Sequence, residues 1–324
     1  MKERHERSVE RVAGSEYNHT MLTLSRLLGF DGPNLLMPQP GVLLEFDAPR
    51  DLANATRNAL KAAAQQIGVV IGALEVAAHS VGGGYQNVAQ WTTPPPALGV
   101  ALAQYVVDGL RAQLMGDTEW DGDETLWLLQ RRRRAEALPL AAIQLLAEAQ
   151  HRGLPTFARR DGLIQIGHGA RGRAFDTTTL PSPFPWHELG DIPLYAVSGG
   201  AAGALIAADY VAALTRQGLH VGFAQASDFD AARALLCDST IDAAVIDLDP
   251  ASLFAHGLPF ARCTACDLVG LPESLLQAHD ADEIARAVAL PLLITVAGGH
   301  ARIRAGFPAL AAFAPLAACA VEFN

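Results

Sequence analysis

Cysteine is scarce in this chain, with four residues among 324. Small secreted domains that depend on disulfides carry a much denser cysteine framework, so scattered thiols are typical of a reducing compartment. The start of the chain, Met1-Lys2-Glu3-Arg4, is charged, and no apolar segment of the kind that a secretory signal needs follows it. We therefore expect a cytoplasmic protein.

Long hydrophobic runs are also missing. The longest weakly polar stretches, residues 195–208 and 308–321, are shorter than the roughly 20 residues that cross a bilayer. Gly or Pro interrupts both stretches. We expect no membrane-spanning segment and no membrane partner.

An excess of positive charge is absent as well. The formal net charge is −10, whereas proteins that bind nucleic acid usually present a basic surface to the phosphates, so we expect no nucleic-acid partner. One basic run exists, Arg131-Arg132-Arg133-Arg134, shortly after an acidic stretch at residues 117–124. The simpler interpretation is a solvated helix face, and the alternative is a site for an acidic polymer or a phosphate.

Hydrophobic residues make up half of the chain, and its length suggests about two domains. The first part, to about residue 115, mixes predicted strands with predicted helices, which is an α+β pattern. The predicted strands cover residues 41–46 and 85–91, and the predicted helices cover residues 52–70 and 97–114.

The middle of the chain contains a polar break, a short structured segment and a linker. A helix is predicted over residues 138–151, followed by short strands at 154–157 and 163–166. Three prolines within residues 181–185 then indicate a linker over residues 177–190.

The remainder alternates between strands and helices. Predicted helices near residues 207–217, 230–236 and 282–288 separate strands predicted at 193–197, 220–224, 243–247, 266–269 and 292–296. Strands separated by helices at this interval indicate βαβ units and a parallel sheet. We expect a doubly wound, mostly parallel α/β domain after an N-terminal α+β domain.

Two stretches carry a resemblance to a known family. Residues 141–173 read AAIQLLAEAQHRGLPTFARRDGLIQIGHGARGR, and residues 191–205 read DIPLYAVSGGAAGAL. The first resembles the segment that leads into the ATP-grasp module of cyanophycin synthetase, which builds an Asp/Arg polymer by ATP-driven amide ligation. The second, together with LLCDSTIDAAVIDLDPASLFAHGLPFARC at residues 235–263, resembles the start of its Mur-ligase-like domain.

The resemblance implies three parts. Residues 1–125 would be an α+β domain similar to the N-terminal domain of the synthetase, to which Gly32-Pro33-Asn34 and residues 85–91 bear a weaker likeness. Residues 126–190 would be a connector, and residues 191–324 a truncated Mur-ligase-like α/β domain. Only about 20 residues separate Gly169 from Asp191, where the family has its ATP-grasp module, so that module is expected to be missing.

The phosphate loop of the Mur-ligase-like domain is degenerate. In the family it reads Thr-Gly-Thr-Asn-Gly-Lys-Thr-Thr, in which backbone N–H groups and Lys hold phosphate and Thr holds Mg²⁺. Here residues 198–205 read SGGAAGAL, so Ser198, Gly199, Gly200 and Gly203 form a vestigial loop without Lys or Thr. The metal-associated Glu of the family falls at Asp247, and residues 270–274 replace a later Asn and Asp-His motif.

These departures imply a catalytically inactive relative of cyanophycin synthetase without a cofactor. We expect a regulatory, scaffolding or polymer-binding partner of a true synthetase or related amide ligase, and a homo-oligomer, because synthetases of this kind assemble through these domains. The alternatives are an ATP-independent hydrolase of amide or isopeptide substrates, and a small-anion binder that uses the Gly199–Gly203 turn.

Two weak catalytic candidates lie in the first part. Glu75 and His79 are four residues apart in a segment predicted to be helical, which would place both side chains on one face, as metal ligands require. A plain surface pair is the simpler interpretation.

Two further motifs have structural explanations beside functional ones. His168, Arg171 and Arg173 lie in a Gly-rich segment that could hold an anion or could simply be a connector turn. Cys263 and Cys266 have the spacing of zinc and redox sites, but no second pair of ligands follows. We expect two buried structural cysteines and no metal site.

Overall fold

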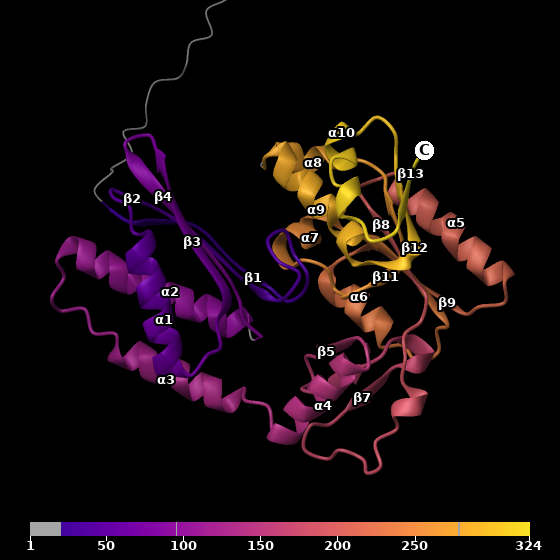
Figure 1. Cartoon of the computed structure of the whole chain (residues 1–324), viewed down its shortest axis with the longest axis horizontal. Helices are drawn as coiled ribbons and strands as arrows, with labels where there is room; N and C mark the ends of the chain where they lie inside the picture. The colour runs from indigo at the N-terminus through magenta and orange to yellow at the C-terminus, as the bar shows by residue number, and fades with distance from the viewer. Residues whose placement is uncertain (1–20, 95, 278) are drawn as a thin grey trace, which may run out of the picture.

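The structure, a computed structural model, describes residues 21–94, 96–277 and 279–324. An antiparallel unit, a small three-stranded unit and a six-stranded parallel sheet follow one another along the chain (Figure 1). The charged start of the chain lies outside the described residues. Within the described ranges, none of the helices combines the length and the apolar character that crossing a membrane requires.

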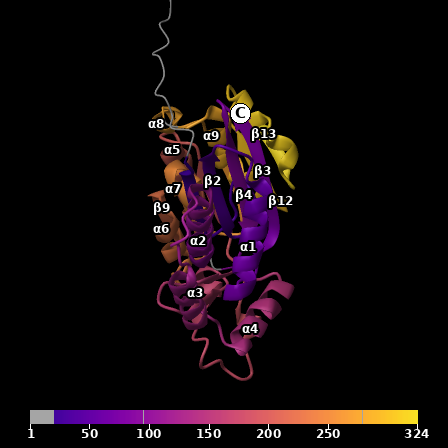
Figure 2. The same ribbon diagram turned by 90° about the vertical axis from the view of Figure 1, so that its left-hand side faces the viewer.

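The N-terminal unit is a four-stranded antiparallel sheet in the order β1-β2-β4-β3, with α1 and α2 packed together against it (Figure 2). Phe46 and Trp91 from the sheet, Leu60 from α1 and Leu102 from α2 meet in a common core. The elements are β1 (Thr23–Phe30), β2 (Gly41–Ala48), α1 (Ala53–Ile67), β3 (Gly72–Val81), β4 (Gly84–Thr92) and α2 (Pro96–Met115). The α+β character predicted for this part is present, although strand β1 was not predicted.

Helix α3 (Asp123–Ala135) contains the basic run. Its Leu129 is buried in the core of the N-terminal unit, so the expected boundary at residue 125 falls inside a helix that packs with that unit. Acidic residues occupy the first turn of α3 and arginines its last turn, an arrangement that complements the helix dipole.

The connector forms a unit of its own. Helix α4 (Leu140–His151) packs against a small antiparallel sheet in the order β5-β6-β7. The strands are β5 (Thr156–Ala158), β6 (Ile164–Ile166) and β7 (Arg173–Phe175), and the turns η1 (Gly169–Arg171) and η2 (Trp186–Glu188) lie on either side of β7. The two predicted strands are therefore confirmed, and β7 adds a third.

The last unit is a six-stranded parallel sheet in the order β13-β12-β11-β8-β10-β9. Helix α5 covers one face, and α6, α7, α9 and α10 pack on the other. The elements are β8 (Leu194–Ser198), α5 (Gly203–Arg216), β9 (Val221–Ser227), α6 (Phe229–Leu236), β10 (Ala243–Leu248), α7 (Pro250–His256), β11 (Cys263–Leu268), α8 (Glu273–Leu276), α9 (Ala281–Ile294), β12 (Thr295–Ile303), α10 (Pro308–Ala311), η3 (Ala314–Leu316) and β13 (Ala320–Phe323).

One strand prediction in this unit was wrong. Residues 292–296 were expected to be a strand, but α9 continues to Ile294 and β12 begins at Thr295. The helix contains Pro291, which normally ends a helix, and Leu290, Pro291 and Leu292 are all buried. A continuous apolar segment beside a proline looks like a buried strand, and only its packing identifies it as a helix end.

The N-terminal unit contacts the α/β unit through β1 and the loop that follows it. Arg26 of β1 forms an ion pair with Glu283 of α9 (Nη1–Oε1 3.1 Å), and its guanidinium lies 5.2 Å from the ring centroid of Phe254 in α7. The amide of Leu258 donates a hydrogen bond to the carbonyl of Pro33 (2.7 Å). Figure 1 shows β1 and this loop between the two larger units.

Candidate functional site

The turn from Ser198 to Gly203, which the resemblance predicts to be a vestigial phosphate loop, lies at the carboxyl end of β8 and leads into α5. In the sheet, β8 is flanked by β10 and β11, and the chain leaves β8 toward β9 on one side and later crosses to β11 on the other. Ligands of open parallel sheets bind outside the carboxyl ends of the strands at such a reversal of strand order. The turn from Ser198 to Gly203 therefore occupies the usual ligand position of this architecture.

Asp247, at the carboxyl end of β10, lies against the start of α5. A Cβ added to Gly203 would be 2.6 Å from Oδ1 of Asp247, so the carboxylate occupies the space beside the first helical residue. Burial raises the pKa of Asp247, a hydrogen bond from the amide of Ala226 to Oδ2 (3.3 Å) opposes this shift, and the charge of Asp249 adds to it. A carboxylate in this position repels an anion at the helix start.

The other side of the turn is closed by the loop after β11. Gly199 has φ +117°, and a Cβ there would collide with the backbone of Gly270. The amide of Val269 donates to the carbonyl of Ser198 (2.9 Å), and Gly200 lies next to Pro272. The segment at residues 270–274 therefore packs backbone against backbone on the turn.

Ser198 is fully buried. Its hydroxyl has no hydrogen-bond partner among the described residues. The one hydroxyl of the vestigial loop is therefore enclosed by protein and does not face solvent. A hydroxyl in that place cannot serve as an open metal ligand.

A cleft of about 380 Å³ lies beside the turn. Ala202 and the first turn of α5 form one wall, and the end of β11 forms another. Arg304 contributes a positive charge, Asp267 a carboxylate and Asn324 an amide, while Leu205 and Ile206 make the lining largely apolar. The cleft offers room for a small ligand.

At the wall of this cleft, Asp267 of β11 takes part in a cluster with Tyr210 of α5 and Arg302 of β12. Asp267 is 2% exposed, accepts a hydrogen bond from the Tyr210 hydroxyl (2.6 Å) and pairs with Arg302 (Nε–Oδ1 2.8 Å). Burial and the neighbouring carboxylate raise the pKa of Tyr210 above its usual range, so its hydroxyl stays protonated. No local sequence pattern points to this cluster, because its members are 35 or more residues apart along the chain.

The candidate anion-binding turn is not open to solvent at His168, which is buried and paired with another residue of the protein. His168 is 1% exposed, and its Nδ1 lies 2.7 Å from Oδ1 of Asp191, whose Oδ2 accepts a hydrogen bond from Arg262 (2.6 Å). Burial alone would raise the pKa of Asp191, but His168 and Arg262 more than offset this, and the net pKa is lowered. His168 thus joins the connector to the α/β unit.

The two arginines of this turn are held by neighbouring residues. The guanidinium of Arg171 lies over Gly190, where a Cβ would be 2.6 Å from Cζ, and Arg173 pairs with Glu188. Arg173 also lines a polar cleft of about 530 Å³ with Arg159, which is itself paired with Asp161. Both arginines at this cleft therefore already have a carboxylate partner.

The expected helical placement of Glu75 and His79 was wrong. Both lie on β3, in a hairpin with β4, and both are exposed. Four residues along a strand span about 13 Å. Glu75 instead accepts a hydrogen bond from Gln90 (2.6 Å) on the adjacent strand. The pair therefore cannot share a metal ion, and the structure does not bring either residue to a cleft with the other.

Cys263 and Cys266 are buried on β11, and the sulfur of each lies 3.3 Å from the Thr295 hydroxyl. Burial raises the pKa of Cys263 to about 12 and that of Cys266 further, so both remain thiols at neutral pH. Buried neutral thiols of this kind are chemically inert. Across the described ranges, no group of three or more His, Cys, Asp or Glu side chains is arranged to hold a metal.

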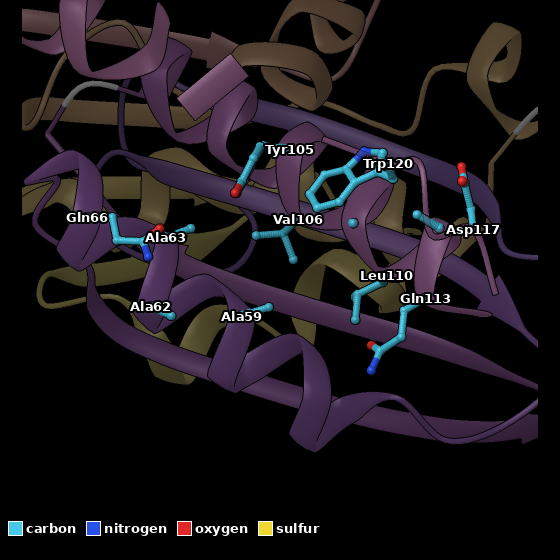
Figure 3. Close-up of a pocket in the computed structure, with 12 residues that line it drawn as sticks. Ala59, Ala62, Ala63, Gln66, Tyr105, Val106, Leu110, Gln113, Asp117 and Trp120 are labelled. Carbon is cyan, nitrogen blue, oxygen red and sulfur yellow. The ribbon is translucent and has the colours of Figure 1, made fainter. Parts of the chain in front are cut away.

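A third cleft, of about 450 Å³, lies between α1 and α2 of the N-terminal unit (Figure 3). Small side chains of α1 leave the space, and Trp120 borders it with its ring 5.8 Å from that of Tyr105. The lining is mostly apolar and brings no acid–base pair together. This cleft could contact a ligand or partner through its apolar surface, but it does not bring catalytic groups together.

Comparison with known proteins identifies a family but not an activity. No curated protein matches the chain. A family model described as a domain of unknown function, DUF4938, matches residues 21–321. This match spans all three structural units: the antiparallel unit, the connector and the parallel sheet. The chain belongs to the DUF4938 family.

Proposed function

We propose that this protein is a non-catalytic relative of ATP-dependent amide ligases that binds a complete ligase, or its polymer, as a regulatory or scaffolding subunit. The lack of a lysine in residues 198–205 is the observation that carries the proposal. In an active phosphate loop, helix N–H groups and a lysine keep the phosphate position positive. Here no lysine of the loop offsets the carboxylate of Asp247, which lies beside Gly203.

The charge of Asp247 would repel a bound phosphate strongly. Two unit charges of the same sign about 4 Å apart repel by roughly 4 kcal/mol at the effective dielectric near a protein surface. Neutralising the transferred phosphoryl group is the main catalytic task of phosphate-binding loops. A nucleotide phosphate beside Asp247 would be repelled at the place where catalysis needs it stabilised.

The likeness to a Mur-ligase-like domain and to cyanophycin synthetase belongs to this proposal. It is supported by the stretches at residues 141–173 and 191–205, by the vestigial loop after the first parallel strand, and by the parallel sheet itself. A retained scaffold with altered chemistry is what a binding partner of the active enzyme requires. The partner would be a complete synthetase or a related amide ligase.

The experiment uses the purified protein and a purified complete cyanophycin synthetase. We expect the two to form a complex in analytical ultracentrifugation, and we expect the protein to change the rate of polymer synthesis by the synthetase. The protein alone should release no phosphate from ATP with Asp, Arg or a polymer primer present. Phosphate release by the protein alone, or the lack of any complex, would contradict the proposal.

A second function, binding of a small anion, is favoured by the 380 Å³ cleft beside the turn, where Arg304 and Asn324 meet an apolar wall. Isothermal titration with phosphate and with nucleotides tests it. Heat of binding that disappears in an Arg304→Ala variant would support this function. No heat with either ligand would dismiss it.

A further inference from the structure

Helix α3 presents an uncovered face in the described part of the chain. Leu126 and Leu129 point into the N-terminal unit, whereas Trp127 is 55% and Leu128 49% exposed. An exposed tryptophan next to an exposed leucine is unusual on a surface that only meets water. Figure 1 shows α3 at the lower edge of the N-terminal unit, below α1 and α2.

Charged residues flank this apolar pair with opposite sign. Glu124 lies one turn before it and Arg131 one turn after it, and both are exposed. Residues seven apart lie two turns apart on one side of a helix. The guanidinium of Arg131 lies 5.7 Å from the centroid of the Trp127 ring, which places the two on the same face. Neither Glu124 nor Arg131 forms an ion pair with another described residue.

The order of these residues makes the face complementary to itself. We propose that α3 pairs antiparallel with α3 of a second copy of this chain, about a twofold axis that passes between Trp127 and Leu128. Such an axis brings Glu124 opposite Arg131 of the second copy, twice, with the apolar residues in the centre. Isologous twofold contacts are the commonest interfaces of homo-oligomers and need this self-complementarity.

The same axis also matches the outer charges. Asp123 lies level with Arg132 of the second copy, whose own helix already pairs it with Glu136, and Asp121, just before the helix, lies level with Arg134. The acidic start of one helix therefore lies along the basic end of the other. Complementary charges fix orientation and register more than they add affinity, which the central apolar residues supply. The parallel orientation is disfavoured, because it would place like charges side by side.

Helix α3 alone is short for a stable interface. Its 13 residues span about 20 Å. A stable dimer usually buries about 800 Å² on each partner. Further exposed apolar side chains precede and follow the helix along the chain: Met115, Trp120, Leu138, Leu140 and Ile143. This inference does not depend on the proposed function, because it uses a different surface.

Charge reversal tests the proposed pairing. Sedimentation equilibrium would be measured at concentrations up to about 100 μM, which populates any dimer with a micromolar dissociation constant. The wild-type protein should be dimeric, and Glu124→Arg or Arg131→Glu should each weaken dimerisation at least tenfold, since each replaces two attractions by two repulsions. Arg216→Glu, the same charge change on exposed helix α5, is the matched control and should leave the dimer intact.

Two restoration experiments separate pairing from misfolding. The double variant Glu124→Arg/Arg131→Glu recreates both ion pairs with reversed sign and should dimerise again. An equimolar mixture of the two single variants should form a heterodimer, although each variant alone is monomeric. A monomeric wild-type protein, or single variants that remain dimeric, would overturn the proposal. So would a monomer that binds poly-aspartate through Arg131, which would assign this face to an acidic polymer.

Discussion

The carboxylate of Asp247 fills the space that a side chain at Gly203 would need, 2.6 Å from the position of its Cβ. The first helical residue of α5 thus has to be glycine for a reason unrelated to phosphate. In a parallel sheet of this kind, the start of that helix is where an anion binds. Here the negatively charged group at the start of the helix is the side chain of Asp247 and not a bound ligand.

Replacing Asp247 with Asn should stabilise the protein at neutral pH. Burial raises the pKa of Asp247, so the ionised form costs stability once the pH exceeds the pKa of the folded state. The asparagine side chain keeps an oxygen that can accept the hydrogen bond from the Ala226 N–H, but it carries no charge. A gain of about 1 kcal/mol corresponds to a rise in Tm of roughly 2–4 °C in a domain of this size.

The pH dependence checks the cause of that gain. As the pH falls through the raised pKa, Asp247 takes up a proton and the advantage of Asn should vanish. Thermal unfolding of both proteins between pH 7 and pH 4 measures the difference. An advantage that stays constant over this range would show that charge is not its source.

Removing Arg302 should destabilise the protein strongly. Asp267 is almost fully buried, and Arg302 supplies its compensating charge. Breaking a buried pair from one side leaves an uncompensated charge and costs about 3–5 kcal/mol. Urea unfolding of Arg302→Met measures this loss, with Arg216→Met on the surface as a control that changes little. If adding Asp267→Asn to Arg302→Met recovers none of the loss, the charge explanation is wrong.

The Asp191 network should make the protein sensitive to acid. Although burial alone raises its pKa, His168 and Arg262 lower it below the unfolded value of about 3.9. The stabilisation is therefore complete above that value and is lost as the pH falls through the folded pKa. Arg262→Met should lose about 1.5–3 kcal/mol at pH 7, the range for hydrogen bonds to charged groups. The difference from wild type in urea unfolding should shrink toward pH 3, and equal losses at both pH values would contradict the network.

A side chain at Gly199 should not be tolerated. The residue has φ +117° and packs against the backbone of Gly270. Strained backbone of this kind costs about 1–3 kcal/mol before the collision is counted. Gly199→Ala should therefore lower the free energy of unfolding by at least about 2 kcal/mol, a value on that scale. Gly298→Ala, where a Cβ meets open space, is the matched control.

Glu75 and His79 should be dispensable. Both are exposed on β3 and are too far apart to hold one metal ion. Glu75→Gln and His79→Ala should each change the free energy of unfolding by less than about 0.5 kcal/mol, as typical surface substitutions do. Zinc should raise the Tm of neither the wild-type protein nor the variants. A zinc-dependent rise that both substitutions remove would restore these residues as a metal site.

The sequence predicts the parallel sheet well, because buried strands and amphipathic helices alternate at regular intervals after residue 191. It fails where local pattern and packing disagree. The alanine-rich segment of β3 has helical composition, but the hairpin turn at Gly82 and Gly83 and the pairing with β4 make it a strand. Strand β13 is only four residues long and follows no pattern strong enough to predict.

The candidate site could be predicted only in part. The turn glycines and the missing lysine are visible in the sequence, since they are neighbours along the chain. The positions of Asp247 and Gly270 around the turn depend on the register of β10 and β11 with β8, which no local pattern reports. His168 looked like part of an open turn, because its partner Asp191 is 23 residues away.

The most direct measurement is ATP turnover by the purified protein with Asp, Arg and a polymer primer present. Phosphate release would be followed for the wild-type protein and for the Asp247→Asn variant, with a complete cyanophycin synthetase as positive control. We predict no release above background for either form. Phosphate release by the wild-type protein that depends on the amino acids would contradict it.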